Sequence, residues 1–95
     1  MIEQTGLVAI YRWRVAPEDR AAFCARWANA TEELRAKGGQ GSMLGEAADG
    51  TLYAIAKWPD RATRKRAFAE QADATPWPEA ERFEPVLLDT LDNRW

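Results

Sequence analysis

Residues 41–60 read GSMLGEAADGTLYAIAKWPD, and this stretch decides the fold. Asp49-Gly50 predicts a two-residue hairpin turn, because such a loop needs positive φ angles that glycine and Asp or Asn tolerate best. The predicted register pairs Ala47 with Leu52, Gly45 with Ala54, Leu44 with Ile55, and Met43 with Ala56. Both faces of the hairpin are then largely apolar, so each face needs a cover.

A strand and a helix precede the hairpin. Residues 7–15, LVAIYRWRV, alternate and are rich in β-branched and aromatic residues, which predicts a strand. Pro17 suits a first helical turn. The helix then runs to about Lys37, where Gly38-Gly39 ends it. One apolar stripe recurs along this helix at Phe23, Trp27, Ala30 and Leu34.

A second helix and a last strand follow. Asp60 is the predicted N-cap of a helix over residues 61–72. Its expected buried side holds Ala62, Phe68, Ala69 and Ala72. We expect a short helical turn over residues 79–83 and a strand over residues 84–92.

The order strand–helix–strand–strand–helix–strand predicts a ferredoxin-like α+β sandwich, with residues 1–95 as a single domain. A four-stranded antiparallel sheet carries both helices on one face. The other face keeps apolar residues from the first strand, from the last strand and from the hairpin, either Leu44 with Ile55 or Met43 with Ala56. An uncovered patch of this kind predicts a homodimer that packs the open sheet faces together.

Composition excludes several classes of site. The 95 residues contain no His and one Cys, so a Ser-His-Asp or Cys-His triad and a zinc site are excluded within the chain. We expect no metal and no other cofactor. The net charge of -2 argues against nucleic-acid binding. No apolar run is long enough for a membrane span, and no signal peptide is visible. Cys24 is the single cysteine, so no disulfide can form within the chain, and we expect the reducing environment of the cytoplasm.

The sequence resembles the antibiotic biosynthesis monooxygenase-like family of dimeric α/β-barrel proteins. The resemblance covers residues 6–91. It rests on YRWRV with the Pro-Glu-Asp helix start, on residues 41–60 with their ending Lys57-Trp58-Pro59-Asp60, and on the Arg/Ala/Phe helix that follows. It implies the ferredoxin-like fold and the dimer. Some members are cofactor-independent monooxygenases that oxidise polycyclic aromatic intermediates in a pocket between sheet and helices.

Other members of that family degrade haem, and the sequence disfavours this activity. The first-strand position that matches their Asn holds Tyr11, and the helix position that matches their Trp falls at Ala67 or Phe68. Their haem-ligating His has no counterpart, since the chain contains no His.

Aromatic residues supply most of the candidate site. The candidates for catalysis are Tyr11 as a hydrogen-bond donor, Arg12 as an anchor for an anionic or enolate oxygen, and Asn29 as a polar group beside the apolar stripe. The candidates for ligand binding are Trp13, Trp27, Tyr53 and Trp58. All but Trp58 have a structural alternative: core packing for Tyr11, Trp13 and Trp27, a salt-bridged sheet end for Arg12, the surface for Asn29, and a cross-strand contact with Glu46 for Tyr53.

Two further features stay open at this point. The basic cluster Arg61, Arg64, Lys65 and Arg66 is either an anion patch or a solvent-facing helix side. Trp77, between two prolines, is either a lid over the pocket or a plug at the dimer edge.

Two functions fit the sequence. One is a cofactor-independent monooxygenase-like protein that acts on a small aromatic substrate. Without His, its general base would be a carboxylate or a Tyr of shifted pKa. The alternative is a non-catalytic homodimer that binds a small ligand or a partner protein.

Overall fold

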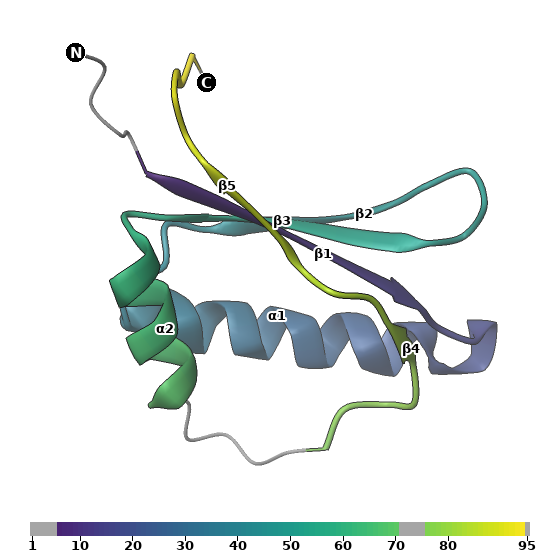
Figure 1. The fold of residues 1–95 in the computed structure, drawn as a ribbon. Coiled ribbons are helices and arrows are strands. Elements are labelled where there is room, and N and C mark those ends of the chain that lie inside the picture. The colour runs from purple at the N-terminus through teal and green to yellow at the C-terminus, as the bar shows by residue number, and fades with distance from the viewer. Residues whose placement is uncertain (1–5, 71–75, 95) are drawn as a thin grey trace.

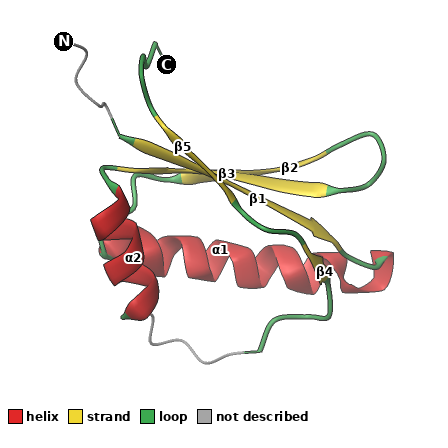
Figure 2. Cartoon of the chain, viewed as in Figure 1, coloured by secondary structure: helices red, strands yellow, loops and turns green. Residues whose placement is uncertain are grey.

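An antiparallel sheet with two helices on one face forms the protein, whose structure is a computed structural model that describes residues 6–70 and 76–94. The strands are β1 (Leu7–Arg14), β2 (Ser42–Glu46), β3 (Leu52–Trp58), β4 (Glu81–Arg82) and β5 (Val86–Asp89). Their order is β2-β3-β1-β4, and β5 also pairs with β1. Both helices lie below the sheet in Figures 1 and 2. The predicted ferredoxin-like α+β fold is confirmed.

The first helix ends where the sequence predicts. A 3-10 turn, η1 (Pro17–Asp19), leads into α1 (Arg20–Ala36). Beyond its last turn, the Gly39 N–H donates to the Leu34 carbonyl and the Gly38 N–H donates to the Arg35 carbonyl. This pair of bonds is the Schellman ending, and Gly38 supplies the positive φ of 109° that it requires. The apolar stripe is also confirmed, because Phe23 and Ala30 are buried.

The predicted hairpin register is wrong by one residue. Observed partners are Glu46 with Leu52, Gly45 with Tyr53, Leu44 with Ala54, Met43 with Ile55 and Ser42 with Ala56. The loop has three residues rather than two, because only Gly50 takes a positive φ, 88°, and Asp49 does not. The Gly50 N–H donates to the Ala47 carbonyl, and Asp49 Oδ1 accepts from the Thr51 N–H at 2.9 Å. A turn followed by a left-handed glycine gives this longer loop.

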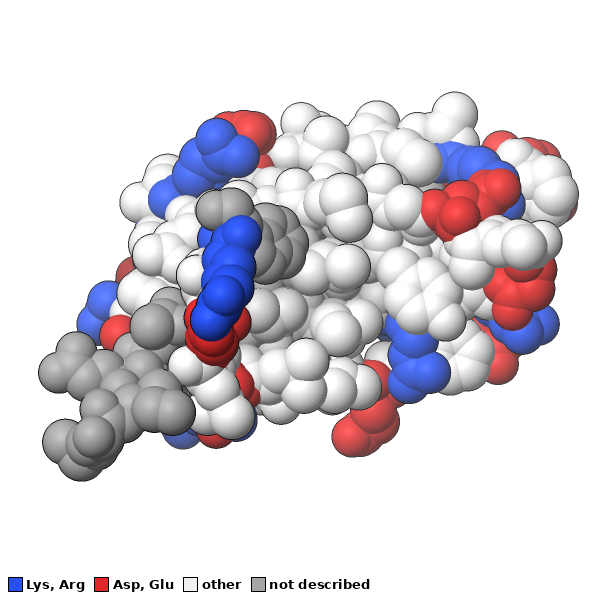
Figure 3. Space-filling model, turned by 90° about the horizontal axis from the view of Figure 1, so that it is seen from above, with Lys and Arg blue, Asp and Glu red and all other residues white. Residues whose placement is uncertain are grey.

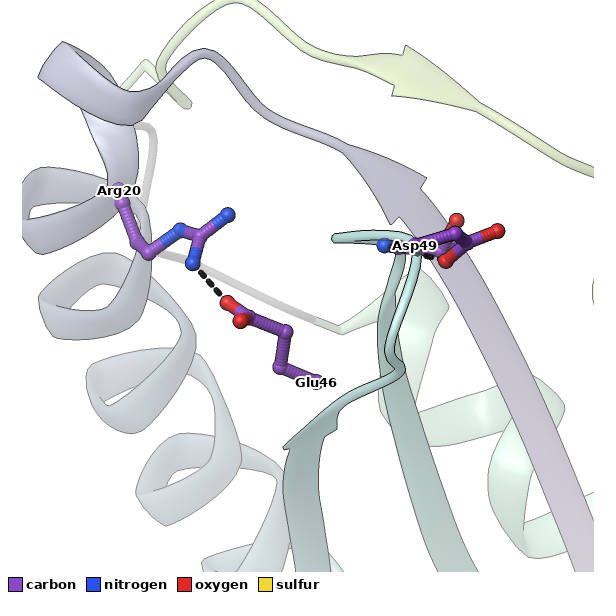
Figure 4. Close-up of polar contacts among 4 residues, drawn as sticks. Arg20, Glu46 and Asp49 are labelled. Atoms are coloured by element: carbon purple, nitrogen blue, oxygen red, sulfur yellow. Dashed lines mark hydrogen bonds and ion pairs between the residues drawn. The ribbon is translucent and has the colours of Figure 1, made fainter.

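A slip of one residue exchanges the faces of a strand. Leu44 therefore lies on the helix face beside Ala54, while Met43 and Ile55 share the open face. The sequence analysis had placed Leu44 and Ile55 together, and the structure separates them. It also overturns the predicted Glu46–Tyr53 pair. Glu46 instead forms an ion pair with Arg20, the first residue of α1 (Figure 4).

The second helix, α2 (Arg61–Ala69), begins as predicted but buries a different side. Asp60 Oδ1 accepts a hydrogen bond from the Thr63 N–H at 2.6 Å, which confirms the N-cap. Ala67 is the buried residue of this helix, whereas Ala62, Phe68 and Ala69 are exposed. The predicted buried set was therefore wrong for these three. The predicted Ala72 lies outside the described residues.

The last strand is interrupted. β4 and β5 both pair with β1, but β4 pairs Trp13 with Arg82 while β5 pairs Ile10 with Val86. Three steps along β1 thus oppose four steps along the partner, so one extra residue bulges out. Pro85 lies in this gap and has no N–H to donate to a ladder. The short helical turn predicted over residues 79–83 is therefore wrong, because Glu81–Arg82 is a strand.

Two core clusters lie between the sheet and the helices. One contains Trp13, Val15, Phe23, Leu52 and Ala54, and the other contains Leu7, Ala9, Trp58 and Ala67. Tyr11, in the middle of β1, packs against both clusters. The core is therefore divided, and the division lies beside Tyr11.

The opposite face of the sheet has no cover within the chain. Figure 3 looks onto this face and shows a central field of uncharged side chains, with charged ones toward its ends. Met43 is 57% exposed and Leu88 is 48% exposed there, and Val86 is exposed as well.

No helix among the described residues is long and apolar enough to cross a membrane.

Candidate functional site

A cavity of about 330 Å³ lies between the sheet and the helices. Small residues leave this space open. Ala30 of α1 and Ala56 of β3 contribute only methyl groups to its lining, and Gly39 and Gly41 add none. The lining draws on both core clusters, with Trp13 from one and Trp58 from the other. The cavity therefore occupies the division in the core.

Aromatic rings form most of the walls. The rings that line the cavity are those of Tyr11, Trp13, Trp27, Trp58, Phe68, Trp77 and Phe83. Tyr11 stacks on Trp13 with ring centroids 6.0 Å apart and planes 18° from parallel. Phe68 lies near both Tyr11 and Trp58, since its ring centroid is 6.5 Å from that of Tyr11 and 6.0 Å from that of Trp58. Such walls suit a flat, apolar ligand.

Tyr11 is held by an arginine from the second helix. Arg64 Nε donates a hydrogen bond of 3.0 Å to the Tyr11 hydroxyl oxygen. The guanidinium carbon also lies 5.6 Å from the Tyr11 ring centroid and 4.9 Å from that of Phe68. Because the hydroxyl oxygen accepts this bond, its own hydrogen is left to donate elsewhere.

The same environment sets the protonation state of Tyr11. Burial raises the pKa of Tyr11 above its ordinary value of 10.0, and this effect outweighs the opposing influence of the Arg64 hydrogen bond and charge. Near neutral pH the hydroxyl therefore keeps its proton. Tyr11 is thus equipped as a hydrogen-bond donor and does not supply the general base that the lack of histidine leaves open.

Trp58 provides a second donor beside the cavity. Its side chain is 2% exposed, and within the described part of the chain its indole N–H has no hydrogen-bond partner. A buried donor without a partner is costly to the folded state. Trp58 is also part of the cavity lining.

The charged groups of the lining are all cationic. They are Arg35 and Arg82, because Lys57 is in the lining but its side chain alternates onto the open face, and no carboxylate joins them among the described residues of the lining. Trp77 closes part of the wall, with its ring centroid 5.3 Å from that of Phe23. The Arg26 guanidinium carbon lies 4.6 Å from the Trp77 ring centroid. Trp77 therefore lies beside the cavity, as its interpretation as a lid over the pocket requires.

The structure brings some of the predicted site residues together and separates others. Tyr11, Trp13, Trp27 and Trp58 all line the cavity. Three predicted residues are absent from the lining: Tyr53 belongs to the open face, Asn29 is exposed on α1, and Arg12 lies with its guanidinium carbon 5.2 Å from the ring centroid of Phe83. The uncharged polar residue of α1 that does line the cavity is Thr31.

Sequence reasoning missed three contributors. Arg64 was grouped with a basic cluster, Phe68 with the helix core, and Arg26 was not singled out. The Arg64–Tyr11 contact spans 53 positions in the chain, and no local pattern encodes it. Arg26 is 6% exposed, although arginine is seldom buried without a partner such as the Trp77 ring.

Comparison with known proteins adds evidence at the level of the fold. SnoaB from Streptomyces nogalater, a cofactor-independent oxygenase, superposes with a TM-score of 0.70 at 17% sequence identity, over 94% of this chain and 96% of that one. The fold is shared with a cofactor-independent oxygenase. Because SnoaB belongs to the antibiotic biosynthesis monooxygenase family, the resemblance inferred from the sequence is confirmed at the level of the fold.

Two other solved structures have the same fold. Rv0793 from Mycobacterium tuberculosis has a TM-score of 0.64 at 21% identity, over 92% of this chain and 96% of its own. A protein of unknown function from Nitrosomonas europaea has a TM-score of 0.67 at 16% identity, over 97% of this chain and 95% of its own. No family model and no curated protein matches the sequence. At these identities the likeness carries the fold and not the reaction.

Proposed function

We propose that this protein binds a small, flat aromatic molecule in the cavity and acts on it as a cofactor-independent monooxygenase. The observation that carries the proposal is the aromatic-walled cavity, whose lining includes Trp58, a residue with a buried indole N–H that has no partner among the described residues. A ligand with a carbonyl or enolate oxygen would satisfy this donor. The Tyr11 hydroxyl, oriented by Arg64, would supply another. The shared fold with SnoaB is consistent with this activity.

The proposed reaction needs little from the protein besides hydrogen-bond donors. An anthrone-type substrate can lose a proton from its methylene carbon, and the resulting anion can pass an electron to O₂ by itself. The carbon then takes up oxygen as a peroxide, and loss of water leaves a carbonyl, so that one methylene and one O₂ give one carbonyl and one water. Donors beside the developing oxyanion would stabilise that anion in an apolar site.

A second candidate function is binding without catalysis. It is favoured by a specific observation: among the described residues the cavity lining holds no carboxylate, and the chain has no histidine. The raised pKa of Tyr11 also removes it as a base near neutral pH. A substrate acidic enough to ionise in water would not need a base from the protein, and a less acidic one would only be bound.

We also propose that a second copy of the chain covers the open face of the sheet. Exposed apolar side chains from both edges support it, Met43 from β2 and Val86 and Leu88 from β5. Between them lie the half-buried Ile10 and Ile55. A contiguous apolar surface of this kind on a small chain is typical of a two-fold interface.

Oxygen uptake tests the proposed reaction. The wild-type protein is given a panel of anthrone and quinol substrates, and uptake is compared with that of Tyr11→Phe and Trp58→Phe. Losing one donor to the oxyanion should lower kcat by about 10²-fold. Tyr53→Phe is the matched control, because it removes the same hydroxyl from the open face and should leave the rate unchanged. Binding without any oxygen uptake would leave the non-catalytic function standing.

A further inference from the structure

A second cavity, which we call the basic pocket, lies where α2 approaches the β1 and β5 strands. Its volume is about 400 Å³. Arg61, Arg64 and Lys65 line one part of it, and Leu7, Leu87 and Phe68 line the rest. Half of the lining is thus cationic and half apolar, which suits an anion attached to an apolar body and not a free inorganic ion.

The charge of this region differs from that of the whole chain. The helix sequence RATRKRAFA holds four cations and no carboxylate, while the protein carries a net charge of -2. Arg61 Nε is 3.1 Å from Asp89 Oδ1, but both side chains are about half exposed, and exposed ion pairs of this kind hold their partners weakly. Among the described residues, Arg64 uses only its Nε in a side-chain hydrogen bond, which it donates to Tyr11. Lys65 makes no ion pair with any described residue. Donors for an anion therefore remain.

The basic pocket adjoins the aromatic cavity. Phe68 lines both, and its side chain is 39% exposed. Arg64 crosses the same boundary, because it lines the basic pocket while its Nε binds the Tyr11 hydroxyl of the aromatic cavity. The two spaces therefore share one side chain, and a ligand that reaches past Phe68 would contact both.

We propose that the basic pocket binds a carboxylate carried by the ligand of the aromatic cavity. The inference rests on the proposed function and narrows its substrate class to aromatic acids. The aromatic body lies among Tyr11, Trp13 and Trp58, and the carboxylate passes Phe68 to reach Arg61 and Lys65. Guanidinium and ammonium donors bind a carboxylate through charge-assisted hydrogen bonds, which are stronger than neutral ones.

A pair of ligands with the same shape and different charge tests this inference. Anthraquinone-2-carboxylate and 2-acetylanthraquinone share the ring system and the ring carbonyls, and only the first is an anion. Their dissociation constants are measured by calorimetry with the wild-type protein and with Lys65→Gln and Arg61→Gln. Arg66→Gln is the matched control, since it removes a cation from the same helix that is not part of the pocket lining.

The wild-type protein should bind the carboxylate about tenfold more tightly than the ketone, as expected for one charge-assisted hydrogen bond. Lys65→Gln and Arg61→Gln should reduce that ratio toward one without weakening the ketone, and Arg66→Gln should preserve it. Equal affinities for the two ligands, or a loss with Arg66→Gln as large as with Lys65→Gln, would overturn the inference alone. Failure of both ligands to bind would overturn the proposed function as well.

Discussion

Among single residues, Tyr11 links the chemistry to the packing. It contacts both core clusters, lines the cavity, and accepts the Arg64 hydrogen bond at 3.0 Å. Its neighbours Ala9 and Trp13 on the helix face are buried, while Tyr11 itself is only half-buried because the cavity lies beside it. The hydroxyl therefore has a firm partner on one side and open space nearby.

The raised pKa of Tyr11 predicts a change in stability at alkaline pH. A group whose pKa is higher in the folded state contributes stability that is fully present below its unfolded pKa of 10.0 and is lost as pH rises through the folded pKa. The free energy of unfolding of the wild-type protein, measured with urea, should therefore fall above pH 10.0, and Tyr11→Phe should remove this part of the decline. Tyrosinate absorbance gives an independent measurement, in which the wild-type curve minus the Tyr11→Phe curve should have its midpoint above 10.0. A midpoint at or below that value would contradict the burial argument.

At the level of elements, the β2–β3 hairpin controls which side chains meet the cavity. Its three-residue loop sets the register that places Leu44 and Ala54 toward the helices and Met43 and Ile55 away from them. Gly50, with φ of 88°, is the residue that makes this loop possible. Because β3 is held by its pairing with β1, a shift of one residue would put Met43 in place of Leu44 on the helix face.

Two glycines of this hairpin give a matched pair of substitutions. A Cβ at Gly50 or at Gly45 would meet no atom within 4 Å, so neither change causes a clash. Gly50→Ala should still lower the free energy of unfolding by about 1–2 kcal/mol, because alanine is disfavoured in the left-handed region. Gly45→Ala should leave it unchanged or raise it by up to about 1 kcal/mol. Urea unfolding at one fixed protein concentration measures both, and equal effects would show that the φ of Gly50 is not what matters.

The sequence predicted the elements well and their details less well. Pro17, Asp60 and Gly38-Gly39 act through local backbone chemistry, so the entry to α1, its end and the start of α2 could be read directly, whereas α2 ends at Ala69 and not at the predicted residue 72. The hairpin register depended on whether Asp49 shares the positive φ of Gly50, and the sequence Asp-Gly permits both loops. The interruption of the last strand at Pro85 was readable in principle, since a residue without an N–H breaks a ladder.

The candidate site was predicted only where a periodic pattern determines a face. Tyr11 and Trp13 follow from the alternation of the first strand, and Trp27 from the helical stripe. The same alternation along the second hairpin strand places Tyr53, next to the buried Ala54, on the open face and outside the cavity lining. Arg64 and Phe68 depend on how α2 packs over β1, a contact between distant segments that no periodicity specifies.

For the whole molecule, the open sheet face predicts self-association. In sedimentation velocity experiments at micromolar concentration, the wild-type chain should behave as a dimer. Met43→Glu and Val86→Glu should each shift it toward the monomer, because a charge placed in an apolar interface must lose its hydration. Ala69→Glu is the control, since Ala69 is also exposed but lies on α2. A wild-type monomer under these conditions would refute the proposed interface.

The central claim is that the cavity holds an aromatic ligand whose oxygen satisfies the buried Trp58 N–H. The most direct measurement is the indole N–H region of a ¹⁵N–¹H correlation spectrum, with the Trp58 signal assigned from its loss in Trp58→Phe. Anthraquinone-2-carboxylate is titrated into the wild-type protein. We predict that the Trp58 signal moves downfield in the proton dimension as its hydrogen bond forms, together with a smaller shift for Trp27. A Trp58 signal that stays in place while the ligand saturates the protein would contradict the account.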